Sequence, residues 1–399
     1  MDNQRILQVC REVLDYAGDR DYEGYNKHDG IESPLTKALS FNLKWGRLFW
    51  TQVVMRSPVN LRPLLGVPRL RNPKGIALFA MACLDMHKVT GEEHYANEAR
   101  LLLDWLVDHT SCGFDMPCWG YPYAWQDIGF FAPAGFPNRI VTYFVCSALL
   151  DGFEHLGEVR YMEAAHEATR FLLDTPRILF ESADQLCMSY VPSDQVDWVV
   201  MDVSVLIAVV LARVGKHTGE ERLGTQAKKL VHYVVDKQTP EGAWFYSHPP
   251  GDSHIGHDNY HTGEILDAID DYRLITGDES YMEAHRLGLE FYAQHLFTAE
   301  GAPKWMSNKT FPHDVHGASQ GIITFSRHPE YFALLDKTLN WTLDTLYSRK
   351  GYFYYQRRAT YTKKFTLMRW CNGWMSHALA LCLVRMQSSR QKSVPPVLG

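Results

Sequence analysis

The chain has 399 residues, of which 46% are hydrophobic and 22% charged, and its formal net charge at pH 7 is −6. This composition excludes a chain that is disordered throughout, because it contains enough apolar side chains to bury a core. We interpret the basic residues as dispersed along the sequence and therefore predict no nucleic-acid partner.

The N-terminal residues 5–17 follow an amphipathic helical pattern and lack the continuous apolar core of a signal peptide. The apolar run 199–214 is short and is interrupted by Asp202 and Ser204, so we expect a buried helix there and no transmembrane segment. No C-x-x-C spacing occurs among the eight cysteines, which favours reduced thiols. We expect a cytoplasmic protein; a position near the inner face of the membrane and a homo-oligomeric state are left open.

A connector motif recurs along the chain at spacings of roughly 50 to 66 residues. It combines a glycine with acidic residues, a pattern typical of one helix ending and the next beginning. The copies are 89–95, 156–161, 217–223 and 275–281, with a degenerate fifth copy at 326–331.

Each connector follows an apolar run of helical length and precedes a more amphipathic one, which predicts pairs of inner and outer helices. The last inner helix has no outer helix behind it, and the N-terminal helix has no inner helix before it. We expect these two to pair with each other and complete a sixth hairpin. The expected inner helices are 75–88, 140–155, 203–216, 263–274, 319–325 and 374–386.

Six helical hairpins closed in this way predict an all-α fold, an (α/α)6 toroid, with an open helical array as the alternative. We expect one domain over residues 1–388 and a flexible tail over 389–399. Short β-like, aromatic segments precede the inner helices, and we expect them to gather at one end of a central funnel, where they could pack on sugar rings. These segments are 22–25, 118–123, 187–192, 242–247, 303–306 and 351–356.

The first polar cluster spans residues 118–127 and continues at 136–139. Its tyrosine and acidic side chains are candidate catalytic groups, and its tryptophan, amide and arginine side chains are candidates to bind substrate. The alternative is that the acid caps a loop and that the aromatic residues only seal the hairpins. The catalytic candidates are Tyr121, Tyr123 and Asp127, and the binding candidates are Trp119, Trp125, Gln126, Asn138 and Arg139.

The second cluster spans 247–264 and opens a helix that we expect to begin near Asp258 or Asn259. Tyr260, His261 and Glu264 fall around its first turn, on two adjacent turns, and are candidate acid–base groups, with Asp258 as a further catalytic candidate. The alternative is that these side chains only cap the helix and form inter-helix hydrogen bonds. We expect His257 and Trp244 to bind substrate. Four histidines here raise the question of a metal site, but no recognised ligand spacing is present, so we predict no metal and no cofactor.

Two further clusters, 313–320 and 363–374, contribute His316, Arg369 and Trp370 as candidate binding residues, and Arg62 lies ahead of the first inner helix. Guanidinium groups bind carboxylates and phosphates through paired hydrogen bonds, so an aromatic funnel with several arginines would suit an anionic sugar. The alternative for each arginine is an ordinary surface ion pair.

Four segments carry a resemblance to a known family: RSPVNLRPLLGVP (56–68), NPKGIALF (72–79), CWGYPYAWQ (118–126) and HDNYHTG (257–263). The chain resembles, over most of its length, six-hairpin proteins encoded among bacterial and archaeal surface-polysaccharide and protein-glycosylation genes. At the level of the fold it is also similar to glucuronyl C5-epimerases and unsaturated glucuronyl hydrolases. The resemblance implies a toroid that acts on glycans, and it supplies no set of catalytic residues.

These observations together predict a carbohydrate-active enzyme that acts on a uronic acid or other anionic sugar. The expected chemistry is proton abstraction next to a carboxylate, as in C5-epimerisation or elimination, and the expected substrate is an oligosaccharide, a polysaccharide or a lipid-linked glycan. Such a reaction needs a base, a proton donor and cations to neutralise an enolate. Candidates for the first two roles are Tyr260, His261, Tyr121 and Tyr123, and for the third Arg62 and Arg369.

Two alternatives remain open from the sequence. One is a glycoside hydrolase that uses two carboxylates, and the other is a non-catalytic glycan-binding or scaffold toroid. The carboxylates available to the hydrolase are Asp127, Asp258, Glu264 and Asp314.

Overall fold

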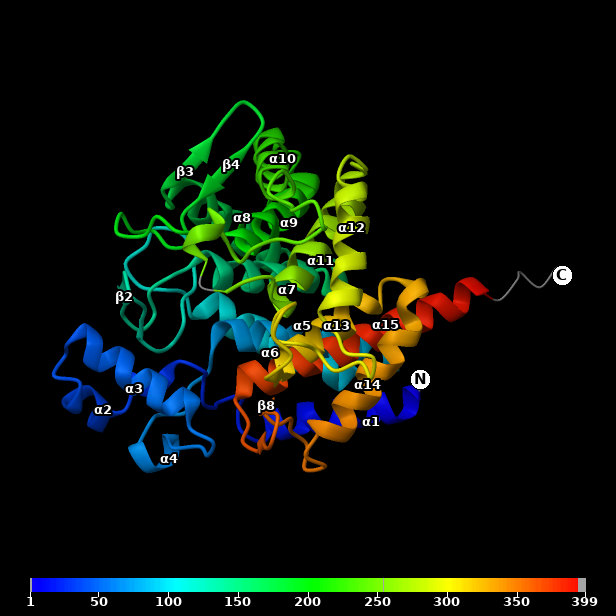
Figure 1. The fold of residues 1–399 in the computed structure, drawn as a ribbon. Coiled ribbons are helices and arrows are strands. Elements are labelled where there is room, and N and C mark those ends of the chain that lie inside the picture. The colour runs from blue at the N-terminus through cyan, green and yellow to red at the C-terminus, as the bar shows by residue number, and fades with distance from the viewer. Residues whose placement is uncertain (1, 254, 394–399) are drawn as a thin grey trace.

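The computed structural model describes residues 2–253 and 255–393. Within these residues, six inner and six outer helices form the expected (α/α)6 toroid (Figure 1). The inner helices are α5 (Pro73–Thr90), α7 (Arg139–Leu156), α9 (Met201–Thr218), α11 (Asn259–Thr276), α13 (Val315–Phe325) and α15 (Trp374–Ser393). The outer helices are α6 (Glu93–Asp108), α8 (Val159–Asp174), α10 (Glu221–Val235), α12 (Met282–His295), α14 (Phe332–Thr345) and α1 (Asn3–Gly18).

The ring is closed. Each inner helix packs against the next, and α15 packs against α5. The N-terminal helix α1 packs against α15, which confirms the predicted sixth hairpin across the two ends of the chain (Figure 1). The structure therefore confirms the closed toroid over an open helical array.

The two layers differ in burial because they differ in their neighbours. In α9 almost every residue from Met201 to Val214 is buried, since an inner helix has neighbours on all sides. In α10 only one stripe, which includes Leu223, Ala227 and Leu230, is buried, as expected for a helix with one face in solvent.

The connectors end the inner helices as the sequence predicts. Gly91, Gly157, Gly219 and Gly277 cap α5, α7, α9 and α11 with φ angles of 70°, 76°, 75° and 74°, a left-handed conformation that glycine adopts without steric cost. The degenerate fifth connector differs: Ser326 ends α13 in a right-handed conformation, and the 3-10 helix η3 (Pro329–Tyr331) leads into α14.

Short antiparallel strands occupy the long connections from outer to inner helices. They are β1 (Trp125–Gln126) with β2 (Phe131–Ala132), β3 (Ile178–Glu181) with β4 (Leu186–Met188), β5 (Val199–Val200) with β6 (Ser247–His248), and β7 (His313–Asp314) with β8 (Gln356–Arg357) and β9 (Thr362–Lys363). Because all inner helices run in the same direction, these connections meet at the end of the ring where the inner helices begin.

The segment before α5 holds elements that the sequence analysis did not assign. It contains η1 (Asp29–Ile31), α2 (Pro34–Leu39), α3 (Lys44–Arg56) and α4 (Arg62–Leu65). A separate 3-10 turn, η2 (Pro250–Asp252), lies between β6 and α11. In Figure 1, α2, α3 and α4 lie together beside the ring. Glu32 accepts a hydrogen bond from Ala124 N (2.6 Å), and Lys363 donates to Met55 O (2.9 Å), so this segment is attached to the strand-bearing end.

At the other end of the chain, α15 runs to Ser393, past the predicted domain boundary at 388, and residues 394–399 of the predicted tail lie outside the described residues. Among the described helices, none has both the length and the apolar character needed to cross a bilayer.

Candidate functional site

Polar side chains stand at the second position of four inner helices, where an apolar residue would otherwise be expected. They are Lys74 in α5, Asp202 in α9, Tyr260 in α11 and His316 in α13. The π-helix η4 (Met368–Gly373), which leads into α15, adds Arg369 and Trp370. We call the following set the axial cluster: Lys27, Lys74, Asp202, Asp258, Tyr260, His261, Glu264, Asp314, His316, Arg369 and Trp370.

His261 is a partly buried histidine that is held in its protonated form. Its Nδ1 donates to Asp258 Oδ2 over 2.8 Å, so the carboxylate of Asp258 binds the imidazole instead of capping α11. Burial alone lowers the pKa of His261, but the carboxylates of Asp258 and Asp202 outweigh burial and raise the pKa to about 9. The imidazolium is therefore the main form at neutral pH and can donate a proton.

His316, in contrast, is held as a neutral imidazole. Its ring stacks on Tyr260 at 4.2 Å between centroids, lies 4.2 Å from Trp374 and meets Trp370 edge-on at 4.7 Å. Burial, together with the positive charges of Lys74 and Arg369, lowers the pKa of His316 well below its usual value. The neutral imidazole can accept a proton. His261 also contacts Tyr260, at 4.1 Å between ring centroids, so a proton donor and a proton acceptor flank one tyrosine.

Glu264 and Asp202 form a pair of buried carboxyl groups within hydrogen-bonding reach of each other. Burial raises the pKa of Glu264, the positive charge of Lys74 opposes this, and the negative charge of Asp202 adds to it. Two adjacent carboxyl groups cannot both ionise cheaply, so this pair holds one proton near neutral pH. Glu264 Oε1 lies 3.6 Å from His316 Nε2.

Three cations of the cluster are held over aromatic rings. The Nζ of Lys27 lies 3.9 Å from the centroid of Trp370, the Nζ of Lys74 lies 3.8 Å from that of Phe144, and the guanidinium of Arg369 lies 5.3 Å from that of Tyr121. In the described part of the chain, none of the three forms an ion pair within 4.0 Å. Burial lowers the pKa of Lys27 to about 8 and that of Lys74 to about 7.

Partly exposed tyrosines surround these groups. Burial raises the pKa of each, so all remain neutral phenols that can donate hydrogen bonds. Tyr121 and Tyr190 are within hydrogen-bonding reach of each other, as are Tyr123 and Arg369. The partly exposed members are Tyr121, Tyr143, Tyr190, Tyr246 and Tyr260, and the buried Tyr123 stacks on Tyr121.

Several buried polar atoms of the cluster have no hydrogen-bond partner among the described residues. They are Asp202 Oδ1, Glu264 Oε1, Arg369 Nε and both ring nitrogens of His316. Buried polar atoms without partners are rare in folded proteins, and they gather where a ligand or bound water completes the bonding. Their convergence marks the axial cluster as the candidate functional site.

Other predicted residues take structural positions. Trp119 donates its indole N–H to Leu106 O (2.9 Å), and Trp244 donates to Val234 O (2.9 Å), so each side chain is bonded to the outer helix of its own hairpin. Asp127 accepts from Gly129 N (2.7 Å) and Phe130 N in the β1–β2 turn. Gln126 bonds within the same turn and to Arg47, while Trp125 meets Phe130 edge-on.

Asn138 accepts a hydrogen bond from Val141 N (3.0 Å) and so caps α7, and the next residue, Arg139, is buried beside Met188. His257 packs on Phe245 and Phe291. Arg62 pairs with Asp29 (2.6 Å) and donates to the carbonyls of Asn26 and Lys27, so it positions the segment that carries Lys27 into the cluster.

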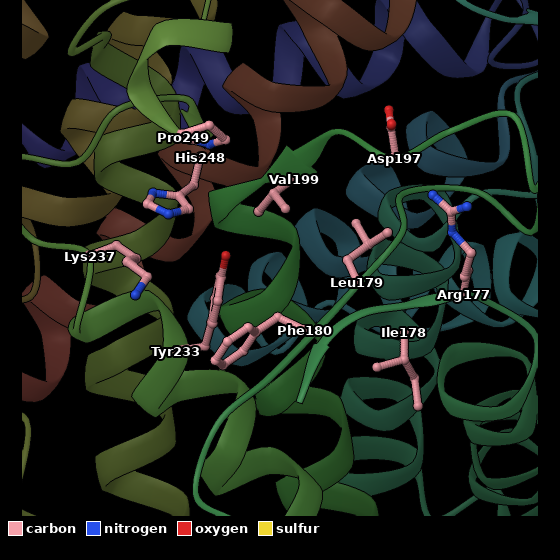
Figure 2. Close-up of a pocket in the computed structure, with 10 residues that line it drawn as sticks. All are labelled: Arg177, Ile178, Leu179, Phe180, Asp197, Val199, Tyr233, Lys237, His248 and Pro249. Atoms are coloured by element: carbon pink, nitrogen blue, oxygen red, sulfur yellow. The ribbon is translucent and has the colours of Figure 1, made fainter. Parts of the chain in front are cut away.

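Among the described residues, no group of three or more His, Cys, Asp or Glu side chains is placed to hold a metal ion. A separate cavity of about 540 Å³ lies between β3, β5 and α10, and its lining includes Arg177, Asp197, Tyr233, Lys237 and His248 (Figure 2). None of its lining residues belongs to the axial cluster.

No protein-family model and no curated protein sequence matches the chain. Solved structures do match its fold. A cellobiose 2-epimerase from Bacillus thermoamylovorans B4167 aligns with a TM-score of 0.64 at 11% identity, over 81% of this chain and 90% of that one. The polysaccharide lyase BACCELL_00875 aligns at 0.59 and 9%, over 99% of both chains. An unsaturated glucuronyl hydrolase specific for heparin aligns at 0.59 and 11%, over 82% and 89%.

Lys27, Lys74 and Asp202 are not among the site residues predicted from the sequence. One signal was available for two of them: Lys74 and Asp202 are single charges at the start of otherwise apolar inner helices, and both are buried. A charge at that position is costly unless it has a function or a partner. Lys27 lies in the segment before α2, which has no counterpart in the repeats and so carried no such signal.

Proposed function

We propose that this protein is a carbohydrate-active enzyme that acts on a uronic acid or a similar anionic sugar by moving a proton at the carbon next to the carboxylate. The observation that carries the proposal is the pair of histidines around Tyr260. Groups whose environments separate their pKa values are suited to act as acid and base in one reaction. Here His316 is neutral and His261 is protonated.

In this reaction the neutral His316 accepts the proton from the sugar carbon, and the electron pair moves into the adjacent carboxylate to form an enolate. In epimerisation, a donor on the other face, His261 or the phenol of Tyr260, returns a proton to the same carbon. In elimination, the electron pair instead expels the neighbouring glycosidic oxygen, which takes up the proton. Tyr260 serves as a donor rather than a base, because its pKa is raised well above the usual value, first by burial.

The three cations over aromatic rings support an anionic substrate. A buried cation without a carboxylate partner can pair with the substrate carboxylate and stabilise the enolate as its charge develops. The N-termini of the inner helices add partial positive charge at the same end of the ring. Lys27, Lys74 and Arg369 are the residues we assign to this role.

The carboxylates favour proton transfer over glycoside hydrolysis. Asp258 is bonded to His261, and Asp314 accepts from Trp370 Nε1 (2.8 Å) and Gln356 Nε2 (2.6 Å). Asp127 lies in a turn, and Glu264 is within hydrogen-bonding reach of Asp202. Glycosidases hold their two carboxyl groups roughly 5 to 9.5 Å apart, so the close pair of Glu264 and Asp202 does not fit that mechanism.

The neighbours of the fold support the broad class. They are an epimerase, a lyase and a hydrolase, all named for carbohydrate substrates. The resemblance to proteins of surface-polysaccharide and glycosylation gene clusters supports a role in glycan biosynthesis. The strongly shifted pKa values in the axial cluster favour an enzyme over a binding-only toroid, because such shifts gather at catalytic sites.

A product assay tests the proposal. Oligosaccharides of glucuronic, galacturonic and mannuronic acid, with neutral cello-oligosaccharides as the control, would be incubated with the protein and followed by NMR. We expect a C5-epimer or an unsaturated uronate from at least one acidic substrate. Release of new reducing ends without either product would support the hydrolase, and tight binding without any product would support the binding module.

A further inference from the structure

The basic residues of the chain are not dispersed, contrary to our interpretation of the sequence. Between Ser33 and Leu84 there are eight lysines and arginines and no aspartate or glutamate, in a chain whose net charge is −6. Most of this stretch is the segment that builds α2, α3 and α4 beside the ring (Figure 1). Lys44, Arg47, Arg56 and Arg69 form no ion pair within the described residues.

Large apolar side chains cover the outer surface of the same segment. Five of them lie within eleven residues at the turn from α2 to α3, and each is at least 44% exposed. Single exposed apolar residues are common, but a contiguous group marks an interaction surface. We call this set the apolar turn: Leu39, Phe41, Leu43, Trp45 and Phe49.

Hydrogen bonds and a close backbone contact fix the conformation of the apolar turn. Arg47 donates to the backbone oxygen (2.8 Å) and to the side-chain oxygen (2.7 Å) of Asn42. Gly46 lies so close to Ser40 that a Cβ atom there would be 2.4 Å from Ser40 O. The outward side chains therefore stand on a fixed backbone and do not result from a frayed loop.

The surface continues onto the neighbouring β1–β2 hairpin. The guanidinium of Arg47 lies 4.3 Å from the ring centroid of Phe131, and its Nε donates to Gln126 (2.9 Å). Ile128 and Phe131 of this hairpin are also exposed. Apolar side chains thus extend over two adjoining elements, with cations between them.

We propose that the apolar turn docks this protein onto an anionic lipid surface. Leucine, phenylalanine and tryptophan side chains enter the boundary between headgroups and acyl chains, while neighbouring lysines and arginines bind anionic headgroups. Lys44, which forms no ion pair within the described residues, stands next to Trp45, and the guanidinium of Arg47 lies against the ring of Phe131, so both kinds of side chain occur together on this surface.

The charge and the side-chain types of this surface argue against two other binding partners, a second copy of the chain and a nucleic acid. A symmetric contact with a second copy would place two basic stretches together, and the residues from Ser33 to Leu84 supply no carboxylate to pair with them. Single-stranded nucleic acid would match the cations and the aromatic rings, but Leu39 and Leu43 have no stacking role with bases.

Docking would also place the axial cluster near the membrane, a consequence that rests on the proposed function. The same segment carries Lys27 into the cluster, and Arg62 fixes it there through Asp29. A glycan attached to a lipid carrier would then reach the cluster while its carrier stays in the bilayer. We assign lipid-linked anionic glycans as the substrate class on this basis.

Vesicle sedimentation of the full chain tests the docking. The probes are vesicles of phosphatidylcholine alone and vesicles of equal parts phosphatidylcholine and phosphatidylglycerol. We expect binding to the anionic vesicles, weaker binding as salt is raised, and little binding to the neutral ones. Lys44→Glu should weaken binding roughly 30-fold, since it changes two charges. Trp45→Ser with Phe49→Ser should weaken it by more than about tenfold.

The controls change equally exposed residues elsewhere: Lys350→Glu, and Leu101→Ser with Leu274→Ser. The proposal is overturned if the wild-type protein does not bind anionic vesicles at low salt, or if the controls weaken binding as much as the apolar-turn variants. It is also overturned if the Trp45 and Phe49 changes convert a dimer to a monomer and leave vesicle binding intact.

Turnover separates this proposal from the proposed function. The Trp45→Ser, Phe49→Ser variant should retain wild-type turnover of a water-soluble uronate oligosaccharide and lose at least about tenfold on the same sugar carried by a lipid in anionic vesicles. Equal activity of wild type and variant on both substrates would contradict the assignment of a lipid-linked substrate. Inactivity of the wild type on both substrates would contradict the proposed function, and the vesicle-binding result would still hold.

Discussion

The carboxylate of Asp258 binds the imidazole of His261 over 2.8 Å, although Asp258 stands at the N-cap position of α11, where such side chains usually bind backbone N–H groups. The Asp258 side chain therefore does not cap α11 and instead stabilises a protonated histidine beside Tyr260. On the neighbouring inner helix α13, His316 also contacts Tyr260 and is kept neutral. These two charge states form the basis of the proposed chemistry.

Asp258→Asn should move the alkaline limb of the pH–activity profile to lower pH. In the wild type His261 must be protonated to donate, so activity falls as the pH rises through about 9. Without the neighbouring negative charge, burial dominates and the pKa of His261 decreases. NMR titration of His261 would measure the shift directly. An unchanged alkaline limb together with an unchanged imidazole pKa would contradict this role for Asp258.

The same pair should make stability depend on pH. The folded pKa of His261, about 9, lies above the unfolded value of about 6.5, so its contribution is complete below pH 6.5 and is lost as the pH rises through 9. The difference in unfolding free energy between wild type and His261→Gln should shrink over that range, by on the order of 2 to 3 kcal/mol. Urea unfolding at several pH values would measure it. A difference that grows with pH would contradict the assigned charge state.

His316→Gln should lower kcat by roughly 100- to 10,000-fold, because it removes the proposed base. The matched control is His285→Gln, which changes another buried histidine whose pKa is lowered by burial, here on the outer helix α12. The control should lose stability without loss of kcat in the folded protein. Equal kcat values for the two variants would remove His316 from the mechanism.

Arg369→Met should reduce kcat/KM for an acidic sugar by roughly 10- to 100-fold, since a hydrogen-bonded charge pair with the substrate carboxylate is lost. Arg222→Met, on the exposed face of α10, is the control and should have no effect. A neutral analogue of the sugar should react equally well with Arg369→Met and the wild type. Sensitivity of the neutral analogue to the substitution would instead indicate a structural role for Arg369.

Arg327→Met should destabilise the fold by about 3 to 5 kcal/mol, because Arg327 pairs with Asp267, Asp270 and Asp271 in a largely buried network. Arg170→Met, which removes an exposed pair with Glu167, should change stability by less than about 1 kcal/mol. Urea unfolding compares the two. Similar values would show that the network contributes little.

The hairpins of the toroid could be predicted because their physics is local and repeated. A glycine that ends a helix, an apolar run and an amphipathic run recur in the same order, and an outer helix such as α10 shows its buried stripe in the sequence. The segment with α2, α3 and α4 could not be predicted in this way, because it is short and occurs only once. It also exposes apolar residues that hydrophobic periodicity would predict to be buried.

The candidate site was only partly accessible to sequence reasoning. Tyr260, His261, Glu264 and His316 lie in the axial cluster, where polar residues at helix starts suggested them. Trp119 and Trp244 bond within their own hairpins instead, and a tryptophan that seals a hairpin looks the same in sequence as one that stacks on a sugar. The charge states of His261 and His316 depend on partners from other helices, which a single sequence does not reveal.

The central claim is that the axial cluster removes a proton from a sugar carbon, and solvent isotope exchange tests it most directly. A uronate oligosaccharide would be incubated with the protein in deuterated water, and NMR would follow the hydrogen next to the carboxylate. We predict deuterium at that carbon, or loss of its hydrogen by elimination, with wild-type protein and not with His316→Gln. Product formation with that hydrogen retained, or exchange that persists in His316→Gln, would contradict the account.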